Sequence, residues 1–308
     1  MRLRPLGSTG IEVSEIGLGT WGMSGDSYGP VDDSESVRLV ERAIELGVTL
    51  IDTADAYGRG RVLGLIGEAI RGKRDSIVLS VRIGNDFYRS VVKKNFAPSY
   101  LAWAVEQSLR RLGTDRLDLL LLHNPANETL RRGDCFRAAR DLRSSGKIRA
   151  WGASVTSGDD ARLAVDGGAE VIQLPYNLLH GQPMNAVISD LPEPRPGLIA
   201  YSALEYGILA GAASPSARFG EKDHRRRRYT REELRSRAAK VGRLRFLVHD
   251  DVQTMAQAAL RFCLANHALS SVLAGTRSAL HLEQDVEASV PPPALPEADL
   301  RRIGEVLA

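Results

Sequence analysis

Short apolar runs alternate along the chain with longer stretches in which apolar residues recur every three or four positions. The short runs predict buried strands, and the longer stretches predict amphipathic helices. Counted from Glu15, eight runs have the character of strands, at about 15–19, 49–53, 77–81, 117–122, 148–153, 169–174, 196–201 and 270–274. Eight strands with helical stretches between them, and no break in composition, predict one α/β domain over residues 1–308, closed as a single (β/α)8 TIM barrel.

Several helical stretches have recognisable ends. The first begins at Asp33 or Ser34, predicted as its N-cap, and is closed by Gly47. Another starts at Pro98 and ends at Gly113, residue types favoured at those two places. Further helices are predicted at about 60–71, 231–247, 252–265 and 297–307, the last of them an extra C-terminal helix outside the barrel.

The chain opens with two apolar runs, 2–6 and 11–13, around a glycine-containing turn. This pattern predicts a β-hairpin, because glycine tolerates the positive φ of tight turns. Just beyond it, residues 17–22 match the dinucleotide fingerprint G-x-G-x-x-G. That fingerprint must lead directly into a helix, and residues 23–33 are too rich in Gly, Ser, Asp and Pro to form one, so the match carries no functional weight.

The longest gap between predicted strands runs from Ala203 to Leu269. Its first part, residues 211–229, is rich in glycine, serine and arginine and includes four consecutive arginines, Arg225 to Arg228. A long segment of this composition predicts a mobile loop at the mouth of the barrel.

The composition and the net charge limit the classes of protein to which this chain could belong. A net charge of +3 over 308 residues is too small to indicate nucleic-acid binding, although a mildly basic mouth suits an anionic cofactor. No run of 18 apolar residues indicates a membrane span, and the first residues lack a signal-peptide core, so a cytoplasmic protein is expected. The six histidines form no His-x-His pair or cluster, which argues against a metal-dependent hydrolase and predicts no metal site.

Four side chains with acid–base chemistry stand at or just past predicted strand ends: Asp52, Tyr57, Arg82 and His123. Taken singly, each has an ordinary structural explanation, such as helix capping or core packing. In a barrel, however, the carboxyl ends of all strands face one mouth, where active sites lie. Their joint placement therefore predicts a proton-transfer site.

The chemistry of these residue types fits the reduction of a carbonyl group. The developing alkoxide needs a proton, and a free phenol with a pKa near ~10 is a poor donor at neutral pH. A neighbouring cation lowers that pKa, an acid fixes the cation, and an imidazole orients the carbonyl. We therefore predict Tyr57 as the proton donor, Arg82 as the cation, Asp52 as its partner and His123 as the orienting group.

These residues resemble the catalytic tetrad of the aldo-keto reductases, which is Asp, Tyr, Lys and His in this order. Within Ser80–Gly84, arginine (Arg82) stands where that family has lysine. The resemblance covers nearly the whole chain. It implies a hairpin that plugs the bottom of the barrel, a loop at 211–229 that covers the cofactor, and NADP(H)-dependent reduction of an aldehyde or ketone to an alcohol.

Further strand ends carry groups suited to a nicotinamide cofactor. Ser154 and Gln173 suit the two ends of a carboxamide, and the face of Tyr201 suits a nicotinamide ring. Arg277 and Ser278 open a predicted helix, and a helix N-terminus with these side chains suits a phosphate. The resemblance implies a full set of cofactor-binding residues, namely Gly19, Thr20, Trp21, Asp52, Ser154, Gln173, Tyr201, Ser202, Leu204, Gly207, Gly275, Arg277, Ser278, His281, Gln284 and Asp285.

Two questions stay open in the sequence. Because the tetrad lysine is replaced by Arg82, the chain could also be a nicotinamide-cofactor-binding protein that no longer reduces carbonyls, either a regulatory subunit or a redox-neutral enzyme. The expected binding partner is a small carbonyl or alcohol substrate, and binding to nucleic acid or to membranes is not expected. The chain could also form a homo-oligomer. A substrate pocket is predicted from six aromatic residues, Trp21, Tyr28, Tyr57, Phe87, Tyr88 and Trp151.

Overall fold

Eight parallel strands form a closed barrel at the centre of the computed structural model, which describes residues 1–88, 91–212, 214, 217–290 and 295–307. The strands follow one another around the barrel in chain order, and the last pairs with the first. They are β3 (Ile16–Gly19), β4 (Leu50–Ala54), β5 (Val78–Ile83), β8 (Leu117–His123), β9 (Ile148–Ser154), β10 (Val171–Pro175), β11 (Gly197–Tyr201) and β12 (Ser271–Gly275). Each overlaps a predicted strand, so the predicted (β/α)8 barrel is confirmed.

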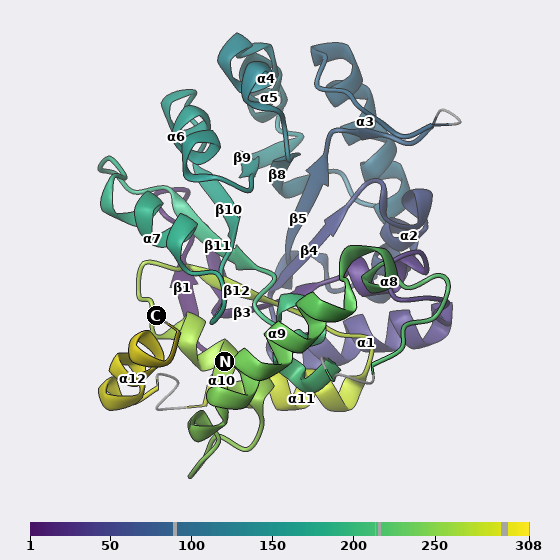
Figure 1. The fold of residues 1–308 in the computed structure, drawn as a ribbon. Coiled ribbons are helices and arrows are strands. Elements are labelled where there is room, and N and C mark those ends of the chain that lie inside the picture. The colour runs from purple at the N-terminus through teal and green to yellow at the C-terminus, as the bar shows by residue number, and fades with distance from the viewer. Residues whose placement is uncertain (89–90, 213, 215–216, 291–294, 308) are drawn as a thin grey trace.

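Helices surround the barrel (Figure 1). They are α1 (Asp33–Glu45), α2 (Arg61–Ala69), α3 (Pro98–Leu112), α4 (Asn127–Arg132), α5 (Asp134–Ser144), α6 (Gly158–Asp166), α7 (Gln182–Ser189), α8 (Arg225–Arg228), α9 (Arg231–Arg243), α10 (Met255–Leu264), α11 (Ala279–Glu287) and α12 (Glu297–Leu307). The predicted start of the first helix was wrong by one residue. Asp32 is the N-cap, because its carboxylate accepts the backbone N–H of Glu35 at 3.0 Å.

The predicted hairpin is formed by β1 (Leu3–Pro5) and β2 (Glu12–Ser14). Leu6 and Ile11 at its turn, and Val13 on β2, are buried in one apolar cluster with residues from inside the barrel. Those barrel residues include the first residues of several strands, such as Leu50 and Val171, so the hairpin fills the N-terminal end of the barrel. The plug that the resemblance implied is therefore present at the bottom of the barrel, and the active site is expected at the opposite, C-terminal end.

Side chains alternate between the barrel interior and the layer under the helices, as the pleat of a strand requires. Leu50 belongs to the interior cluster, whereas Ile51 packs in the layer between strands and helices. The same alternation turns Asp52 inward on β4 and Arg82 inward on β5. The charged groups thus lie inside the barrel at its C-terminal end.

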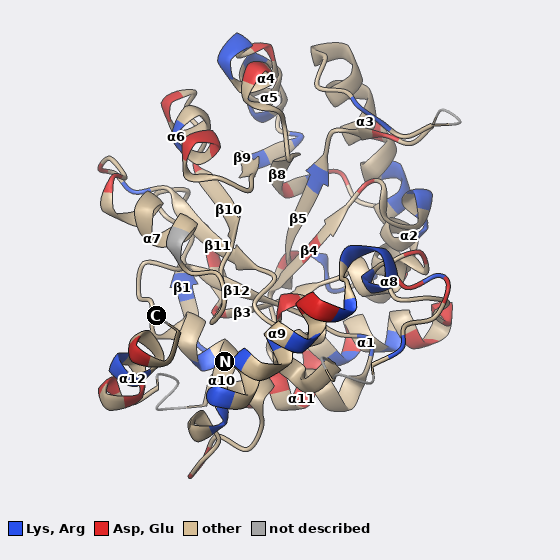
Figure 2. Cartoon of the chain, in the orientation of Figure 1, with Lys and Arg blue, Asp and Glu red and all other residues tan. Residues whose placement is uncertain are grey.

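Charged residues concentrate on the outer helices, while the barrel strands are largely uncharged (Figure 2). The run of four arginines forms helix α8 beside the mouth. A small hairpin that was not predicted, β6 (Asn85–Asp86) with β7 (Lys93–Lys94), follows β5 at the same end. Within the described part of the chain, no helix is both long and apolar enough to cross a membrane.

A buried carboxylate fastens the hairpin to the barrel floor. Glu15 is fully buried and accepts hydrogen bonds from Arg2 at 3.0 Å and Arg4 at 2.9 Å. Arg4 also donates to the backbone oxygens of Leu269 (3.0 Å) and Leu264 (3.2 Å), in the segment that leads into β12. One ion-pair network therefore ties three separate segments of the chain together.

We expect Glu15→Gln to lower the free energy of unfolding by about 3 kcal/mol, because it leaves the largely buried guanidinium of Arg4 without its counter-charge. Urea unfolding followed by circular dichroism measures the change. Glu283→Gln is the matched control, since Glu283 pairs with Arg42 at 2.8 Å on the surface and should cost about 0.5 kcal/mol. Equal losses in the two variants would show that burial of Glu15 contributes nothing.

Candidate active site

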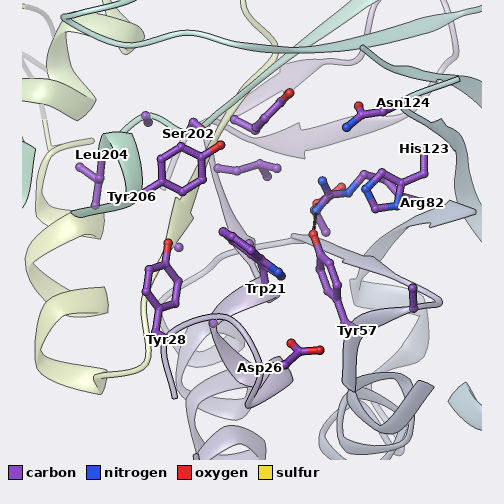
Figure 3. Close-up of a pocket in the computed structure, with 18 of the residues that line it drawn as sticks. Trp21, Asp26, Tyr28, Tyr57, Arg82, His123, Asn124, Ser202, Leu204 and Tyr206 are labelled. Atoms are coloured by element: carbon purple, nitrogen blue, oxygen red, sulfur yellow. Dashed lines mark hydrogen bonds and ion pairs between the residues drawn. The ribbon is translucent and has the colours of Figure 1, made fainter. Parts of the chain in front are cut away.

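The four predicted catalytic residues meet in one cavity of about 670 Å³ at the C-terminal end of the barrel. Asp52, Tyr57, Arg82 and His123 all line it, and Figure 3 shows the last three pointing toward one another. They come from β4, the turn after it, β5 and β8. The barrel therefore assembles the predicted tetrad, Arg82 included.

Asp52 and Arg82 form an ion pair at the floor of this cavity. Arg82 Nη2 lies 2.8 Å from Asp52 Oδ1, and the other carboxylate oxygen accepts Ser80 Oγ and Gln173 Nε2, each at 2.9 Å. Complete burial raises the pKa of Asp52, while the charge of Arg82 and these hydrogen bonds act in the opposite direction. Side chains on β5 and β10 therefore hold the carboxylate in one orientation.

The phenol oxygen of Tyr57 accepts a hydrogen bond from Arg82 Nη2 at 2.5 Å. A guanidinium can only donate, so the Tyr57 hydroxyl proton is free to point elsewhere, into the cavity. Burial raises the pKa of Tyr57 and outweighs the lowering by Arg82. The expectation that the neighbouring cation brings this pKa down was therefore wrong for the net shift, although the cation acts in the predicted direction.

His123 is held as a neutral imidazole. Burial, followed by the charges of Arg82 and Lys94, keeps the pKa of His123 well below its ordinary value. The side-chain amide nitrogen of Asn85 lies 2.9 Å from His123 Nδ1. An amide nitrogen donates, so Nδ1 accepts and the ring proton lies on Nε2.

Two residues of the β6–β7 hairpin that contact His123, Asn85 and Lys94, were not predicted as site residues. Asn85 lines the cavity and sets the His123 tautomer, and Lys94 Nζ donates to the backbone oxygen of His123 at 2.5 Å. Burial lowers the pKa of Lys94 to about 8, and Asp55 opposes this. The only available signal was a polar pair directly after Gly84 at a strand end.

The buried polar atoms beside the tetrad fit a nicotinamide carboxamide. Ser154 and Gln173 are fully buried, and Ser154 Oγ and Gln173 Oε1 have no hydrogen-bond partner among the described residues. Buried polar atoms are normally paired, because leaving one unpaired costs free energy. A hydroxyl and an amide oxygen match the amide group of the carboxamide. Tyr201 lines the cavity, whereas Ser154 and Gln173 do not, and Gln173 is linked to the site by its 2.9 Å hydrogen bond to Asp52.

A second cavity of about 820 Å³ adjoins the first and shares with it Gly22, Tyr28, Leu204, Tyr206, Gly207 and Gly275. Five predicted cofactor residues line only this second cavity, namely Arg277, Ser278, His281, Gln284 and Asp285. Ser278 caps helix α11, since its hydroxyl accepts the His281 N–H at 3.4 Å. The two cavities form a groove that runs from the tetrad to a helix N-terminus, the shape that a dinucleotide requires.

The remaining predicted cofactor residues divide into two groups. Gly19, Trp21 and Ser202 line the first cavity. Thr20 lines neither cavity and bonds to the backbone oxygen of Asp52 at 3.0 Å, so its hydroxyl fastens β3 to β4. The structure does not bring Thr20 to the groove.

The aromatic pocket was predicted only in part. Trp21, Tyr28 and Tyr57 line the first cavity, whereas Phe87, Tyr88 and Trp151 line neither cavity. Trp151 alternates with the inward residues of β9 and packs outside the barrel, 5.6 Å from the ring of Phe136. Phe87 and Tyr88 stack on each other at 4.1 Å beside Arg111. Their assignment to the pocket was wrong.

The segment 211–229, predicted as a mobile cover, lies against the mouth in its described part; residues 213 and 215–216 fall outside the described residues. Asp223 forms an antiparallel bridge with Tyr28. The ring of His224 sits 4.6 Å from Trp21 and 5.0 Å from Tyr28. This segment covers the junction of the two cavities, and its mobility stays a prediction.

The model of the aldo/keto reductase family matches residues 15–308. The aldo-keto reductase YhdN of Bacillus subtilis (strain 168) is 33% identical over 229 residues, which cover 73% of this chain and 69% of that protein. The NADH-specific methylglyoxal reductase of Escherichia coli (strain K12) is 30% identical over 233 residues, covering 68% and 70%.

Solved structures give the same picture. The holo form of aldo-keto reductase AKR11C1 from Bacillus halodurans is similar to this chain with a TM-score of 0.82 and 25% identity. The match covers 100% of this chain and 97% of that one.

The second cavity contains a titratable group with a testable pH dependence. Asp285 is buried, its Oδ2 has no partner among the described residues, and burial raises its pKa to about 7. In the unfolded chain the carboxyl ionises near pH 4. The contribution of its protonated form to the free energy of unfolding is therefore complete below pH 4, and it is lost as the pH rises to about 7.

We therefore expect Asp285→Asn to raise the melting temperature of the cofactor-free protein by several degrees at pH 8 and by much less at pH 5. Thermal unfolding at the two pH values measures it. Asp166→Asn, at an exposed carboxylate, is the control and should behave alike at both. A gain for Asp285→Asn that does not depend on pH would contradict the assigned ionisation.

Proposed function

Because the chain belongs to the aldo/keto reductase family, whose members are oxidoreductases that use nicotinamide cofactors, we propose that it reduces an aldehyde or ketone with NADP(H) and Tyr57 as proton donor. The observation that carries this proposal is the hydrogen bond from Arg82 to Tyr57, within a cavity that also holds Asp52 and His123. It leaves the phenol proton directed into the space where a carbonyl would lie.

The proposed division of labour follows from the protonation states. Ser154, Gln173 and Tyr201 would hold the nicotinamide, which would supply the hydride when bound. Neutral His123 carries its proton on Nε2 and can donate a hydrogen bond to the carbonyl oxygen. Tyr57 gives its proton to the oxygen as negative charge develops there, and Arg82 stabilises the phenolate that remains.

Asp52 acts on this chemistry through Arg82. It holds the guanidinium in position and neutralises part of its charge. Arginine spreads its charge over a plane and does not give up a proton in proteins, so Arg82 serves only as an electrostatic and positioning group. Re-protonation of Tyr57 after each reduction must then come from solvent.

The alternative is a cofactor-binding protein that no longer reduces carbonyls because Arg82 replaces lysine. The intact contacts of Arg82 to both Tyr57 and Asp52 argue against it, since the arginine occupies the bridging position of a tetrad cation. The site thus retains each element that the proposed proton transfer needs.

We propose a preference for NADP(H) because of the residues that line the second cavity. Arg277 and Ser278 stand at the N-terminus of α11, and no carboxylate lies within 4.0 Å of Arg277 among the described residues. Arg277 Nη1 makes long contacts of 3.5 Å with the backbone oxygens of Gly29 and Pro30. An arginine without a carboxylate partner at a helix N-terminus suits a phosphate monoester. The carboxylates of Asp32 and Glu35 line the same cavity, so the preference rests on Arg277 outweighing them.

We expect Arg277→Ala to weaken NADPH binding about tenfold while leaving the dissociation constant of NADH nearly unchanged, since one charge-assisted contact contributes about 1.5 to 3 kcal/mol. Titrations of both cofactors by protein fluorescence at fixed salt measure this. Arg301→Ala, at an exposed arginine on α12, is the control for loss of charge alone. Equal affinities for NADPH and NADH in the wild type, or tighter NADH, would overturn the NADP(H) assignment.

For the proton donor, we expect Tyr57→Phe to reduce kcat by a factor of a thousand or more while NADPH affinity changes less than threefold, because the hydroxyl acts only in the transition state. We expect Arg82→Lys to raise kcat and to shift its pH dependence, because a compact ammonium lowers the phenol pKa more than a shared guanidinium does. Steady-state rates with a panel of aldehydes and ketones across pH measure both.

Retained turnover in Tyr57→Phe would mean that another group donates the proton. If the wild type binds NADPH but reduces nothing in the panel, and Arg82→Lys alone creates activity, the natural protein is not a reductase and the cofactor-binding alternative holds.

A further inference from the structure

The four consecutive arginines of α8 differ in their surroundings. Arg225 is neutralised within the chain, since its Nη2 lies 2.6 Å from Asp223 Oδ2 and its Nε lies 3.0 Å from Asp223 Oδ1. Arg226 lies 3.9 Å from Glu221 at the surface. Arg228 has no carboxylate within 4.0 Å among the residues that the structure describes.

Arg228 faces the catalytic cavity. Its side chain lines the first cavity together with Tyr57 and His123, and it does not line the second. The guanidinium carbon lies 3.9 Å from the centroid of the Tyr206 ring, and Tyr206 itself lines the cavity. Stacking on an aromatic face fixes the plane of a guanidinium and leaves its N–H groups free for an anion.

The ring that supports Arg228 is itself fixed by a buried network. Glu205 accepts hydrogen bonds from Arg237 at 2.7 Å, from Asn177 at 3.1 Å and from Tyr229 at 3.3 Å. It precedes Tyr206, and both residues have positive φ, 45° and 56°. Non-glycine residues hold this conformation only where neighbouring contacts enforce it, so the position of Tyr206 is set by the fold.

Other charges near the cavity do not neutralise Arg228. Asp52 is paired with Arg82 at 2.8 Å. Asp26 also lines the cavity, but Figure 3 places it on the far side of Trp21 from Tyr206. Glu205 acts on Arg228 from beyond 4.0 Å and is itself paired with Arg237 at 2.7 Å, and Tyr229 shares a hydrogen bond with the guanidinium. The part of the cavity beside Tyr206 therefore presents an oriented cation that, among the described residues, has no carboxylate in direct contact.

We propose that Arg228 binds an anionic group, a carboxylate or a phosphate, of the carbonyl compound that the enzyme reduces. The inference rests on the proposed function and names the substrate class, an aldehyde or ketone that carries an anion away from the carbonyl. Arg228 is then a specificity-determining residue, and the carbonyl end of the substrate lies toward Tyr57 and His123. The diphosphate of the cofactor is the other anion that could come near, and the experiment separates the two.

The test compares two aldehydes of the same shape, the anion 4-carboxybenzaldehyde and its neutral amide 4-formylbenzamide. The wild type should have a kcat/KM at least tenfold higher for the anion. Arg228→Met keeps an apolar stem on Tyr206 and should lower kcat/KM for the anion tenfold or more, mainly through KM. The same variant should change kcat/KM for the amide less than twofold.

Arg227→Met is the matched control, because Arg227 is the neighbouring arginine that lines neither cavity, and the change should leave both substrates unaffected. Arg228→Lys should restore part of the preference for the anion. If Arg228→Met instead weakens NADPH binding and slows both aldehydes equally, Arg228 serves the cofactor and the proposal is wrong. Unchanged kinetics in Arg228→Met would overturn it as well.

A binding measurement keeps this test separate from the proposed activity. Benzoate and benzamide are titrated into the protein with NADP⁺, with tryptophan fluorescence as the readout, since Trp21 lines the cavity. Benzoate should bind at least tenfold more tightly than benzamide, and Arg228→Met should remove the difference. If no aldehyde is reduced but this difference is present, the reductase proposal fails while the anion site stands. Equal binding of the two probes would remove the anion site whatever the activity.

Discussion

The ion pair between Asp52 and Arg82 is the interaction on which the rest of the site depends. It lies at the C-terminal end of the barrel interior, where polar side chains replace the apolar ones that fill the rest. Hydrogen bonds from neighbouring groups help to offset the cost of burying such a pair. Ser80 and Gln173 donate to the carboxylate, so strands β4, β5 and β10 are joined through one carboxylate. Tyr57 accepts from Arg82 Nη2, whereas Arg82 Nε has no hydrogen-bond partner among the described residues. The catalytic phenol is thus positioned by the same contacts that stabilise the barrel.

Burial and neighbouring charge together set the pKa of the titratable groups around this pair. Burial raises the pKa of Tyr57 and the positive charge of Arg82 lowers it, with burial the stronger. For His123 the two effects act together, because burial and the neighbouring cations both disfavour a charged ring. A neutral donor phenol and a neutral imidazole are the states in which a carbonyl oxygen can receive two hydrogen bonds. The cavity is therefore arranged for the ground state of a reduction.

The groove extends this chemistry away from the tetrad. The segment 202–207 separates its two cavities and contains three non-glycine residues with positive φ, Ser202, Glu205 and Tyr206. Such residues gather where a fold must hold side chains in fixed places for a ligand. The described part of 211–229 packs over the same segment through Arg228 and His224. The strained turn 202–207 and the arginine-rich segment 211–229 therefore border both the cofactor region and the substrate region.

The sequence by itself determined the barrel and most of the residues at its mouth. Strand runs with helices between them, and the rule that parallel strands end at one face, were enough to bring Asp52, Tyr57, Arg82 and His123 together. The alternation along β9 was also readable, and applying it to Trp151 would have placed that ring outside the barrel. What only the tertiary structure decided were contacts between segments distant in the chain. The Asn85 contact that sets the His123 tautomer, and the difference between Arg225 and Arg228, depend on which groups pack against each other and exclude water. Local sequence patterns contain no information on either, because pKa values and ion pairing are properties of the packed surroundings and not of the residue type.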